Sequence, residues 1–266
     1  MTQPVLPSPA ATLVLLRDRP PADVEALLLQ RHAKSKFAAG DYVFAGGKVE
    51  ADDMPPDGEG FCHGLTAGQA AARLGGDLAP RDALSYWVGA IREAFEEVGV
   101  LLAYEADGRL LRIASEAKPR YESYRTACQK ASPAFFDMLR AEKLTLATDR
   151  LAYFAHWITP EEQPLRFDTR FFAALMPPGQ EPAVDGHEIV DLKWLTPAEA
   201  AAALKRKEIG LRFPTIKNLE LVAAGGSPAS SVVESLGRRE VQTIRPRVLQ
   251  VAGQPVAVLP GDPRWY

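Results

Sequence analysis

Residues 80–99 combine an apolar stripe with a cluster of carboxylates at helical spacing. An α-helix turns about 100° per residue, so Glu93, Glu96 and Glu97 fall on one side of it. The opposite side is apolar and carries Leu84, Trp87, Val88, Ile91, Phe95 and Val98. Like charges three and four residues apart destabilise a helix, so we expect a cation to compensate them. A solvated acidic face is the alternative.

The composition is that of a soluble globular protein and excludes several classes of function. The 266 residues fit one large domain, and a net charge of -3 gives no basic patch for nucleic acid. No stretch is apolar for long enough to span a membrane. Cys62 and Cys128 suggest neither a zinc site nor a disulfide framework. Because the N-terminus also lacks a signal-peptide pattern, we expect a cytoplasmic protein.

Strands and helices follow one another without regular alternation, which predicts the α+β class. Two apolar runs, 11–17 and 24–31, flank a turn-rich stretch and predict a β-hairpin. Further strands are predicted at 42–44, 100–104, 151–158, 169–175 and 188–195, and a terminal hairpin at 245–259 around Gly253. Helices are predicted at 66–74, 80–98, 121–130, 133–142, 196–207, 214–224 and 231–236.

The pair Gly46-Gly47 precedes the acidic helix in the sequence and forms a recognisable motif together with its carboxylates. Five residues separate Gly47 from Asp53, and the helix then reads Arg-Glu-Ala-Phe-Glu-Glu-Val-Gly-Val from Arg92. This pattern resembles the Nudix box: Gly, five residues, Glu, seven residues, then Arg-Glu-apolar-any-Glu-Glu-any-Gly-apolar. Two features depart from the box. Asp53 replaces its first Glu, and residues 54–91 occupy the gap that the family fills with seven residues.

The long gap does not prevent the two halves of the box from meeting. They need to be neighbours in space, and lengthening a surface loop costs only about 0.6 kcal/mol per doubling. We therefore interpret residues 1–266 as a single Nudix hydrolase domain with an insertion at 54–80, and the sequence leaves open whether this insertion folds back as a lid or wall over the site. A second, helical insertion is expected at 105–150, and a C-terminal helix and hairpin extension at 211–266.

The resemblance implies a Nudix-type mixed β-sheet sandwiched between helices, and metal-assisted hydrolysis of a diphosphate. Mg²⁺ or Mn²⁺ would be the cofactor, because hard cations take oxygen ligands and bridge carboxylate to phosphate. Glu96 and Glu97 are then the main metal ligands, and Glu93 is a ligand or orients the attacking water. A backbone carbonyl of Gly46 or Gly47 would complete the set.

Two further charged positions are assigned by the same resemblance. Arg92 is expected to brace the loop or a carboxylate, with a plain surface ion pair as the alternative. A late acidic residue often serves the family as ligand or base, and Glu188 stands ahead of a Trp-containing strand where that residue is expected. The alternative for Glu188 is a strand-edge surface residue, and Glu181 and Asp185 are the other candidates.

Two segments are similar to the branch of the family that hydrolyses coenzyme A. Residues 27–47 lead from a Leu pair through basic residues to Phe-Ala-Gly-Gly, a partial match to the segment before the box in those enzymes. Residues 156–172 resemble the peroxisomal coenzyme A diphosphatases, which also carry a long insertion inside the box. Arg31, Lys34 and Lys36 would bind the phosphates of such a substrate, with solvated loop cations as the alternative.

The leading hypothesis is hydrolysis of coenzyme A or acyl-coenzyme A to 3′,5′-ADP and (acyl-)4′-phosphopantetheine. The alternatives are ADP-ribose, NADH or another nucleoside diphosphate derivative as substrate, and a non-catalytic Nudix-like binding domain. His156 is either a partly buried strand histidine or a catalytic one. The extension at 211–266 carries no recognisable chemistry, and the sequence leaves a homodimer open.

Overall fold

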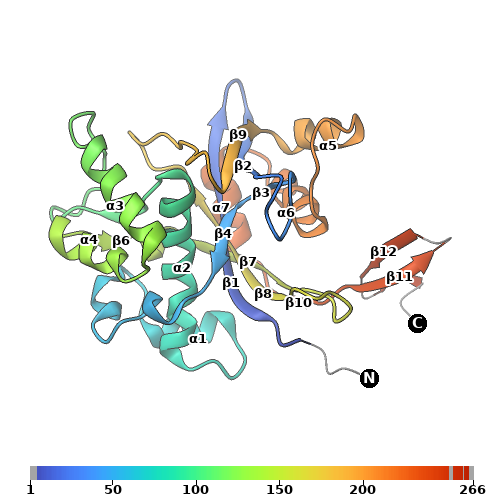
Figure 1. Ribbon diagram of the computed structural model, residues 1–266, viewed down its shortest axis with the longest axis horizontal. Helices are drawn as coiled ribbons and strands as arrows, with labels where there is room; N and C mark the ends of the chain where they lie inside the picture. The colour runs from blue at the N-terminus through green and yellow to red at the C-terminus, as the bar shows by residue number, and fades with distance from the viewer. Residues whose placement is uncertain (1–4, 252–253, 260, 264–266) are drawn as a thin grey trace.

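A mixed β-sheet of eight strands forms the centre of the molecule (Figure 1). The structure is a computed structural model and describes residues 5–251, 254–259 and 261–263. The predicted turn at Gly253 lies outside these residues. The strand order is β10-β7-β8-β1-β2-β3, and β4 pairs with β1 while β9 pairs with β2. The sheet consists of β1 (Ser8–Arg19), β2 (Asp23–Arg31), β3 (Tyr42–Val43), β4 (Ala45–Lys48), β7 (Ala152–Ile158), β8 (Phe167–Leu175), β9 (Ile189–Leu195) and β10 (Thr243–Ile244).

The predicted hairpin is confirmed, because β1 and β2 pair antiparallel with Arg19 opposite Asp23. Successive side chains of a strand point to opposite faces. In β1 the side chains of Leu13 and Leu15 join one hydrophobic core, and those of Val14 and Leu16 join the other. Both faces of the sheet are covered, which explains why this strand is a continuous apolar run.

Helices cover both faces of the sheet, as the α+β interpretation predicts (Figure 1). One core holds side chains from α1 (Ala67–Leu74), α2 (Pro80–Val98), α3 (Lys118–Lys130) and α4 (Ala134–Glu142). The other core holds side chains from α5 (Pro197–Lys205), α6 (Phe213–Ala224) and α7 (Ala229–Gly237). Within the described residues, no helix is both long and apolar enough to cross a membrane.

The carboxylate helix α2 begins and ends where the sequence predicts. Pro80 occupies its first turn, and Gly99 ends it in the left-handed conformation with φ 71°, donating its N–H to the carbonyl of Phe95. The whole apolar stripe from Leu84 to Val98 is buried. Burial of that stripe fixes the rotation of the helix, and so fixes which way Glu93, Glu96 and Glu97 project.

The strand predicted at 100–104 is shorter than expected. Only Ala103–Tyr104 forms a strand, β5, which pairs with β6 (Thr145–Leu146). The buried side chain of Gln180 donates to the carbonyl of Leu101 and accepts from its N–H, both at 2.9 Å. These backbone groups are thereby used before a strand ladder can form.

The segment 54–80 packs against the first half of α2 and does not cover the carboxylates. It contains the short helix Gly58–Phe61 and α1, and Arg81 Nη2 donates to the carbonyls of Met54 and Pro55 at 2.9 and 2.8 Å. None of its residues lines the cavity described below. The sequence left open whether this segment forms a lid or wall over the site, and its apolar side chains instead join the core beside α2.

At the C-terminal end, β11 (Arg247–Val251) and β12 (Gln254–Val258) pair as the predicted hairpin and form a two-stranded sheet of their own. Figure 1 shows this hairpin projecting from the body of the molecule.

Candidate active site

The two separated halves of the predicted motif meet through Asp53 and Arg92. Arg92 Nε donates to Asp53 Oδ1 at 2.6 Å, and Nη2 donates to Asp53 Oδ2 at 3.1 Å. Both side chains are buried, with 1% of Asp53 and 3% of Arg92 exposed. Burial raises the pKa of Asp53 against the opposing hydrogen bonds from Arg92. The excursion 54–91 therefore begins and ends at one buried ion pair.

Arg92 also supplies the cation that the acidic helix requires. Its Nη1 donates to Glu93 Oε1 at 3.0 Å and to Glu96 Oε2 at 3.1 Å, and its Nη2 donates to the carbonyl of Lys48 at 2.8 Å. Burial alone would lower the pKa of Arg92, but the hydrogen bond and charge of Asp53 raise it above its ordinary value. A permanently charged guanidinium thus joins the loop, the strand β4 and two carboxylates.

Gly46 and Gly47 lie inside the strand β4, which follows the strand predicted at 42–44 and pairs with β1. Gly46 N–H donates to Glu97 Oε2 at 2.9 Å. A Cβ atom on Gly47 would lie 2.6 Å from Glu93 Oε1, and one on Gly46 would lie 2.5 Å from the carbonyl oxygen of Ala11. At Gly46 a side chain would meet the backbone of β1, so glycine is required there, and Gly47 lies directly against the carboxylate of Glu93.

The acidic face of α2 is largely buried, which excludes the alternative interpretation of a solvated acidic surface. Glu97 is only 5% exposed, and burial together with the charge of Glu93 raises its pKa well above the ordinary value. Burial also raises the pKa of Glu93 to about 7, with Arg92 opposing and Glu96 adding to the shift. Buried carboxylates this close together favour protonation or a bound cation.

The donors on this face suit a hard divalent cation. Glu96 Oε1 is buried without a hydrogen-bond partner, and carboxylate oxygens are what Mg²⁺ and Mn²⁺ prefer. Within the part of the chain that the structure describes, no three His, Cys, Asp or Glu side chains already stand in an arrangement that holds a metal ion. Glu93 and Glu96 are instead both bonded to Nη1 of Arg92.

A cavity of about 900 Å³ opens beside the carboxylates. Glu93 and Glu96 line it, together with Gly46, Gly47 and Arg92. Of the basic residues predicted to bind substrate, Arg31 and Lys36 line the cavity, and Lys34 does not. Its apolar wall is formed by residues that include Phe37, Trp157, Ile158, Leu165, Phe167, Phe171, Phe213 and Val248.

The late acidic residue Glu188 lies at the same cavity, paired with Arg31 through Nη2 of the guanidinium. Nη1 of Arg31 lies 3.6 Å from Glu97 Oε1, so this arginine stands between two candidate ligands. Asp185 instead organises the loop, because its Oδ1 accepts the N–H groups of residues 187, 188 and 189 at 2.9 to 3.1 Å. Glu181 is exposed and does not line the cavity.

His156 belongs to the strand network and does not line the cavity. It is 8% exposed, and its ring nitrogens lie 2.5 Å from Asp168 Oδ1 and 2.8 Å from Thr243 Oγ1.

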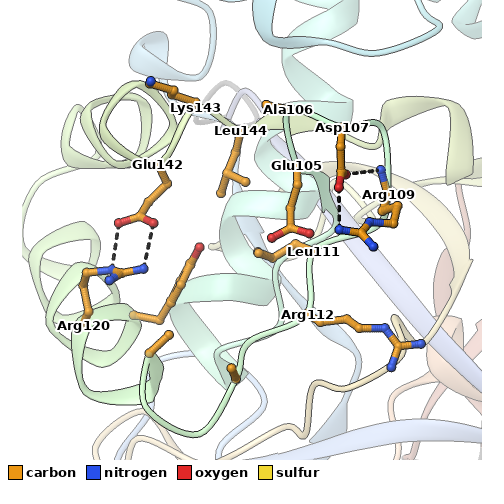
Figure 2. Close-up of a pocket in the computed structure, with 13 residues that line it drawn as sticks. Glu105, Ala106, Asp107, Arg109, Leu111, Arg112, Arg120, Glu142, Lys143 and Leu144 are labelled. Carbon is orange, nitrogen blue, oxygen red and sulfur yellow. Dashed lines mark hydrogen bonds and ion pairs between the residues drawn. The ribbon is translucent and has the colours of Figure 1, made fainter.

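A second cavity, of about 500 Å³, lies among α3, α4 and the loop after β5 (Figure 2). Charged side chains that line it pair with one another, Arg120 with Glu142 and Arg109 with Asp107.

Sequence reasoning missed two groups of residues that the fold brings to this site. Arg125 and Gln129 of α3 donate to the backbone at the C-terminal end of α2. Arg212 and Phe213 line the cavity from the extension at 211–266, which showed no chemistry in the sequence. No spacing in the chain signals these contacts, because each joins segments that are distant in sequence.

The fold is that of the Nudix hydrolases. Among solved structures, a NUDIX hydrolase from Alicyclobacillus acidocaldarius aligns with a TM-score of 0.66 at 25% sequence identity, over 83% of this chain and 92% of that one. The sequence profile described as the NUDT19 Nudix domain matches residues 69–222, more than half of the chain. The chain therefore belongs to the Nudix hydrolase family, in its NUDT19-type branch.

Two curated relatives share a name. The human acyl-coenzyme A diphosphatase NUDT19 is 30% identical over 280 residues, which cover 91% of this chain and 73% of the relative. The Gallus gallus protein of the same name is 30% identical over 239 residues, covering 75% of this chain and 61% of the relative.

Proposed function

We propose that the chain hydrolyses the diphosphate of coenzyme A or an acyl-coenzyme A, releasing 3′,5′-ADP and (acyl-)4′-phosphopantetheine. The observation that carries the proposal is the single cavity that joins Glu93 and Glu96 to Arg31, Lys36 and an extended apolar wall. A diphosphate with a bulky group on each side needs charged and apolar lining together. The names of the two curated relatives support the same substrate class.

Glu93, Glu96 and Glu97, with a backbone carbonyl of Gly46 or Gly47, would hold Mg²⁺ or Mn²⁺. When bound, such an ion polarises the phosphoryl group and neutralises the charge that develops on it. Glu93 and Glu96 each give one carboxylate oxygen to Arg92, so their other oxygens, which include the unpartnered Glu96 Oε1, would be available to such an ion.

The remaining charged residues have separate roles in this proposal. Arg31 lies between Glu97 and Glu188 and can transfer its hydrogen bonds to the anionic diphosphate. Glu188 would then be released to act as a ligand or a base at the cavity. Lys36 would bind a phosphate of the substrate from the cavity wall. Lys34 is exposed and lies away from the lining, so we assign it no direct contact.

A substrate panel tests the activity. The purified protein is incubated with coenzyme A, acyl-coenzyme A, ADP-ribose or NADH in the presence of Mg²⁺ or Mn²⁺, and the products are identified by mass spectrometry. We expect 3′,5′-ADP and phosphopantetheine from coenzyme A. Turnover of ADP-ribose or NADH alone would instead support a different Nudix pyrophosphatase, and turnover of none would support a binding domain.

The carboxylate assignment is tested by Glu97→Gln, which keeps the shape and the oxygen that accepts from Gly46 N–H. We expect kcat to fall at least roughly a hundredfold, which corresponds to about 2.7 kcal/mol of transition-state stabilisation. Glu116→Gln is the matched control, since Glu116 is exposed and lines neither cavity. Full activity of the folded Glu97→Gln protein would show that the metal site has been assigned to the wrong residues.

Several expectations from the sequence stay predictions. They are the division of residues 1–266 into one domain with insertions, the cytoplasmic location, the lack of nucleic-acid and membrane partners, and the homodimer. Sedimentation equilibrium of the purified protein would decide the last of these.

A further inference from the structure

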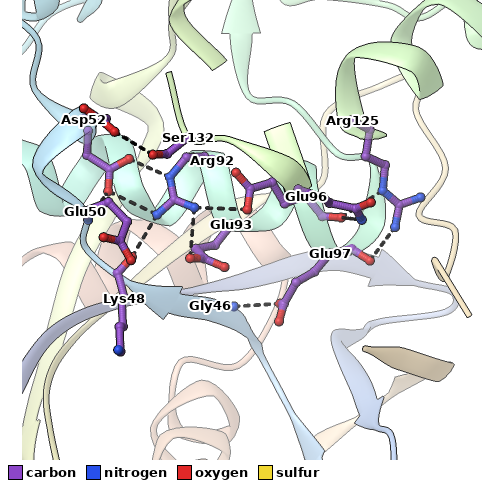
Figure 3. Close-up of polar contacts among 12 residues, drawn as sticks. Gly46, Lys48, Glu50, Asp52, Arg92, Glu93, Glu96, Glu97, Arg125 and Ser132 are labelled. Carbon is purple, nitrogen blue, oxygen red and sulfur yellow. Dashed lines mark hydrogen bonds and ion pairs between the residues drawn. The ribbon is translucent and has the colours of Figure 1, made fainter. Parts of the chain in front are cut away.

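Helix α3, which showed no chemistry in the sequence, bonds to the end of the carboxylate helix. Arg125 Nε donates to the carbonyl of Glu96 at 2.9 Å, and its Nη2 donates to the carbonyl of Glu97 at 2.7 Å (Figure 3). Gln129 Nε2 donates to the same carbonyl of Glu96 at 2.7 Å. The carbonyls that receive these bonds belong to the two residues whose side chains are the main candidate metal ligands.

The physical need for these donors is clear. The last carbonyls of a helix have no partners within it, and the N–H groups of Gly99 and Val100 turn back to Phe95 and Ala94. The carbonyls of Glu96 and Glu97 instead accept hydrogen bonds from the side chains of Arg125 and Gln129 on α3. Only 2% of Arg125 is exposed, so its charge acts at short range on the negative end of the α2 dipole.

Gln129 extends the connection to the opposite side of the cavity. Its Nε2 also lies 3.4 Å from Asp185 Oδ2. The other oxygen of Asp185 accepts the N–H of Glu188, as well as those of the two flanking residues, and so fixes the loop that carries Glu188. Glu188 pairs with Arg31, which reaches back toward the carboxylate of Glu97.

These contacts form a closed ring that starts at the backbone of Glu97 and returns to its carboxylate. One half of the ring passes through Arg125 and Gln129 on α3, and the other half passes through Asp185, Glu188 and Arg31. A further hydrogen bond lies just beyond α3, where Ser132 Oγ donates to Asp52 Oδ2 at 2.8 Å beside the Asp53–Arg92 pair. The α3 segment therefore contacts every chain segment that carries a candidate carboxylate ligand.

We propose that Arg125 and Gln129 are positioning residues of the metal site, which set the distance between the carboxylates of α2 and Glu188. The inference rests on the proposed function, because it assumes that these carboxylates bind a divalent ion. Neither side chain lies among the candidate ligands. Their effect is exerted through the backbone of Glu96 and Glu97 and through the loop at Asp185.

The test measures metal binding in the absence of substrate. Free Mn²⁺ is titrated with the full chain and followed by electron paramagnetic resonance, which gives a Kd without any turnover. The variants are Arg125→Met, Arg125→Lys and Gln129→Met, each of which retains an unbranched side chain. Arg120→Met is the matched control, because Arg120 lies on the same helix but pairs with Glu142, and its side chain is 57% exposed. Thermal unfolding establishes that each variant is folded.

We expect the Kd for Mn²⁺ to rise at least about tenfold in Arg125→Met and about three- to tenfold in Gln129→Met. Arg125→Lys, which can reach one carbonyl, should lie between Arg125→Met and the wild type. Arg120→Met should match the wild type. With saturating Mn²⁺, we expect kcat of the Arg125→Met protein for coenzyme A to fall more than KM changes, because Arg125 is not among the residues that line the cavity.

The results separate the failure of this inference from the failure of the proposed function. If the wild type binds Mn²⁺ and hydrolyses coenzyme A, but folded Arg125→Met and Gln129→Met bind Mn²⁺ equally well, the positioning role is overturned and the function stands. If the wild type neither binds Mn²⁺ nor hydrolyses coenzyme A, both are overturned, and hydrolysis without Mn²⁺ binding would overturn the positioning role alone. Should Arg125→Met not fold, the exposed Gln129→Met decides the matter by the same Kd.

Discussion

Arg92 Nε donates to Asp53 Oδ1 over 2.6 Å, although 39 positions separate the two residues in the sequence. This contact closes the excursion 54–91 and lets the Nudix box act as one unit. Asp53 replaces the Glu that the family usually has, at a point where the loop lies close to α2. A Cβ atom on Gly89 would already lie 2.9 Å from Asp53 Oδ2, so the loop lies directly against α2.

Replacing Asp53 by Ala should destabilise the protein severely. The change leaves the guanidinium of Arg92 buried without its main partner, a defect that costs about 3–5 kcal/mol. The free energy of unfolding in urea measures the loss. Asp52→Ala is the control, since Asp52 is exposed and makes one hydrogen bond to Ser132. A loss below about 1 kcal/mol in Asp53→Ala, equal to that of the control, would contradict the anchoring role.

Gly89→Ala tests the close approach of loop and helix from the other side. Alanine favours a helix interior by about 1 kcal/mol over glycine, so a freely accessible position would be stabilised. Here the added methyl group would lie 2.9 Å from the Asp53 carboxylate and 3.4 Å from Val49 Cγ2. We therefore expect a net destabilisation of about 1–3 kcal/mol. Gly68→Ala in α1, where nothing lies within 4 Å of the added Cβ, should be neutral or stabilising.

The elements that the sequence predicted well are those whose signals are local. The helix α2 has Pro80 in its first turn, an apolar stripe of period 3.6 and Gly99 as its stop, and all three signals act within the element. The hairpin of β1 and β2 is similar, because two apolar runs flank a short turn. The carboxylates of the site were predictable for the same reason, since they share one face of one helix.

The parts that were missed depend on contacts between segments distant in sequence. Arg125 lies on a helix with no recognisable motif, and only the packing of α3 against α2 directs its guanidinium to the carbonyls of Glu96 and Glu97. The segment 100–102 has strand-like residues, but the side chain of Gln180 takes the backbone groups of Leu101. Lys34 and Lys36 are two residues apart in one loop, and only the tertiary fold decides which of them faces the cavity.

Asp168 should stabilise the protein at neutral pH and lose this effect in acid. Burial alone would raise its pKa, but the hydrogen bond with His156 and the charge of Arg170 outweigh burial and lower it. A lowered pKa in the folded state stabilises above the unfolded value of about 3.9, and the effect disappears as the pH falls through the folded value. We expect Asp168→Asn to cost about 1–3 kcal/mol at pH 6.

The measurement is urea unfolding of both proteins between pH 6 and pH 2.5, and the quantity compared is the difference between their free energies of unfolding. That difference should shrink below pH 4, because Asp168 becomes protonated and loses its charge. The other carboxylates contribute equally to both proteins, so their effects cancel in the difference. Asp137→Asn is the control, since the Asp137 side chain is 77% exposed. A difference that stays constant across this range would show that Asp168 acts through packing and not through its charge.

Arg212 should distinguish coenzyme A from dephospho-coenzyme A, which lacks the 3′-phosphate. It lines the cavity from the start of α6, with its guanidinium 5.4 Å from the ring centre of Phe37 and its Nε 2.8 Å from Asp41. We expect Arg212→Gln to lower kcat/KM for coenzyme A about tenfold, or about 1.4 kcal/mol, and to leave dephospho-coenzyme A within twofold. Arg206→Gln, an exposed pair with Glu208, is the control. Equal losses for both substrates would mean that Arg212 only supports the wall through Asp41.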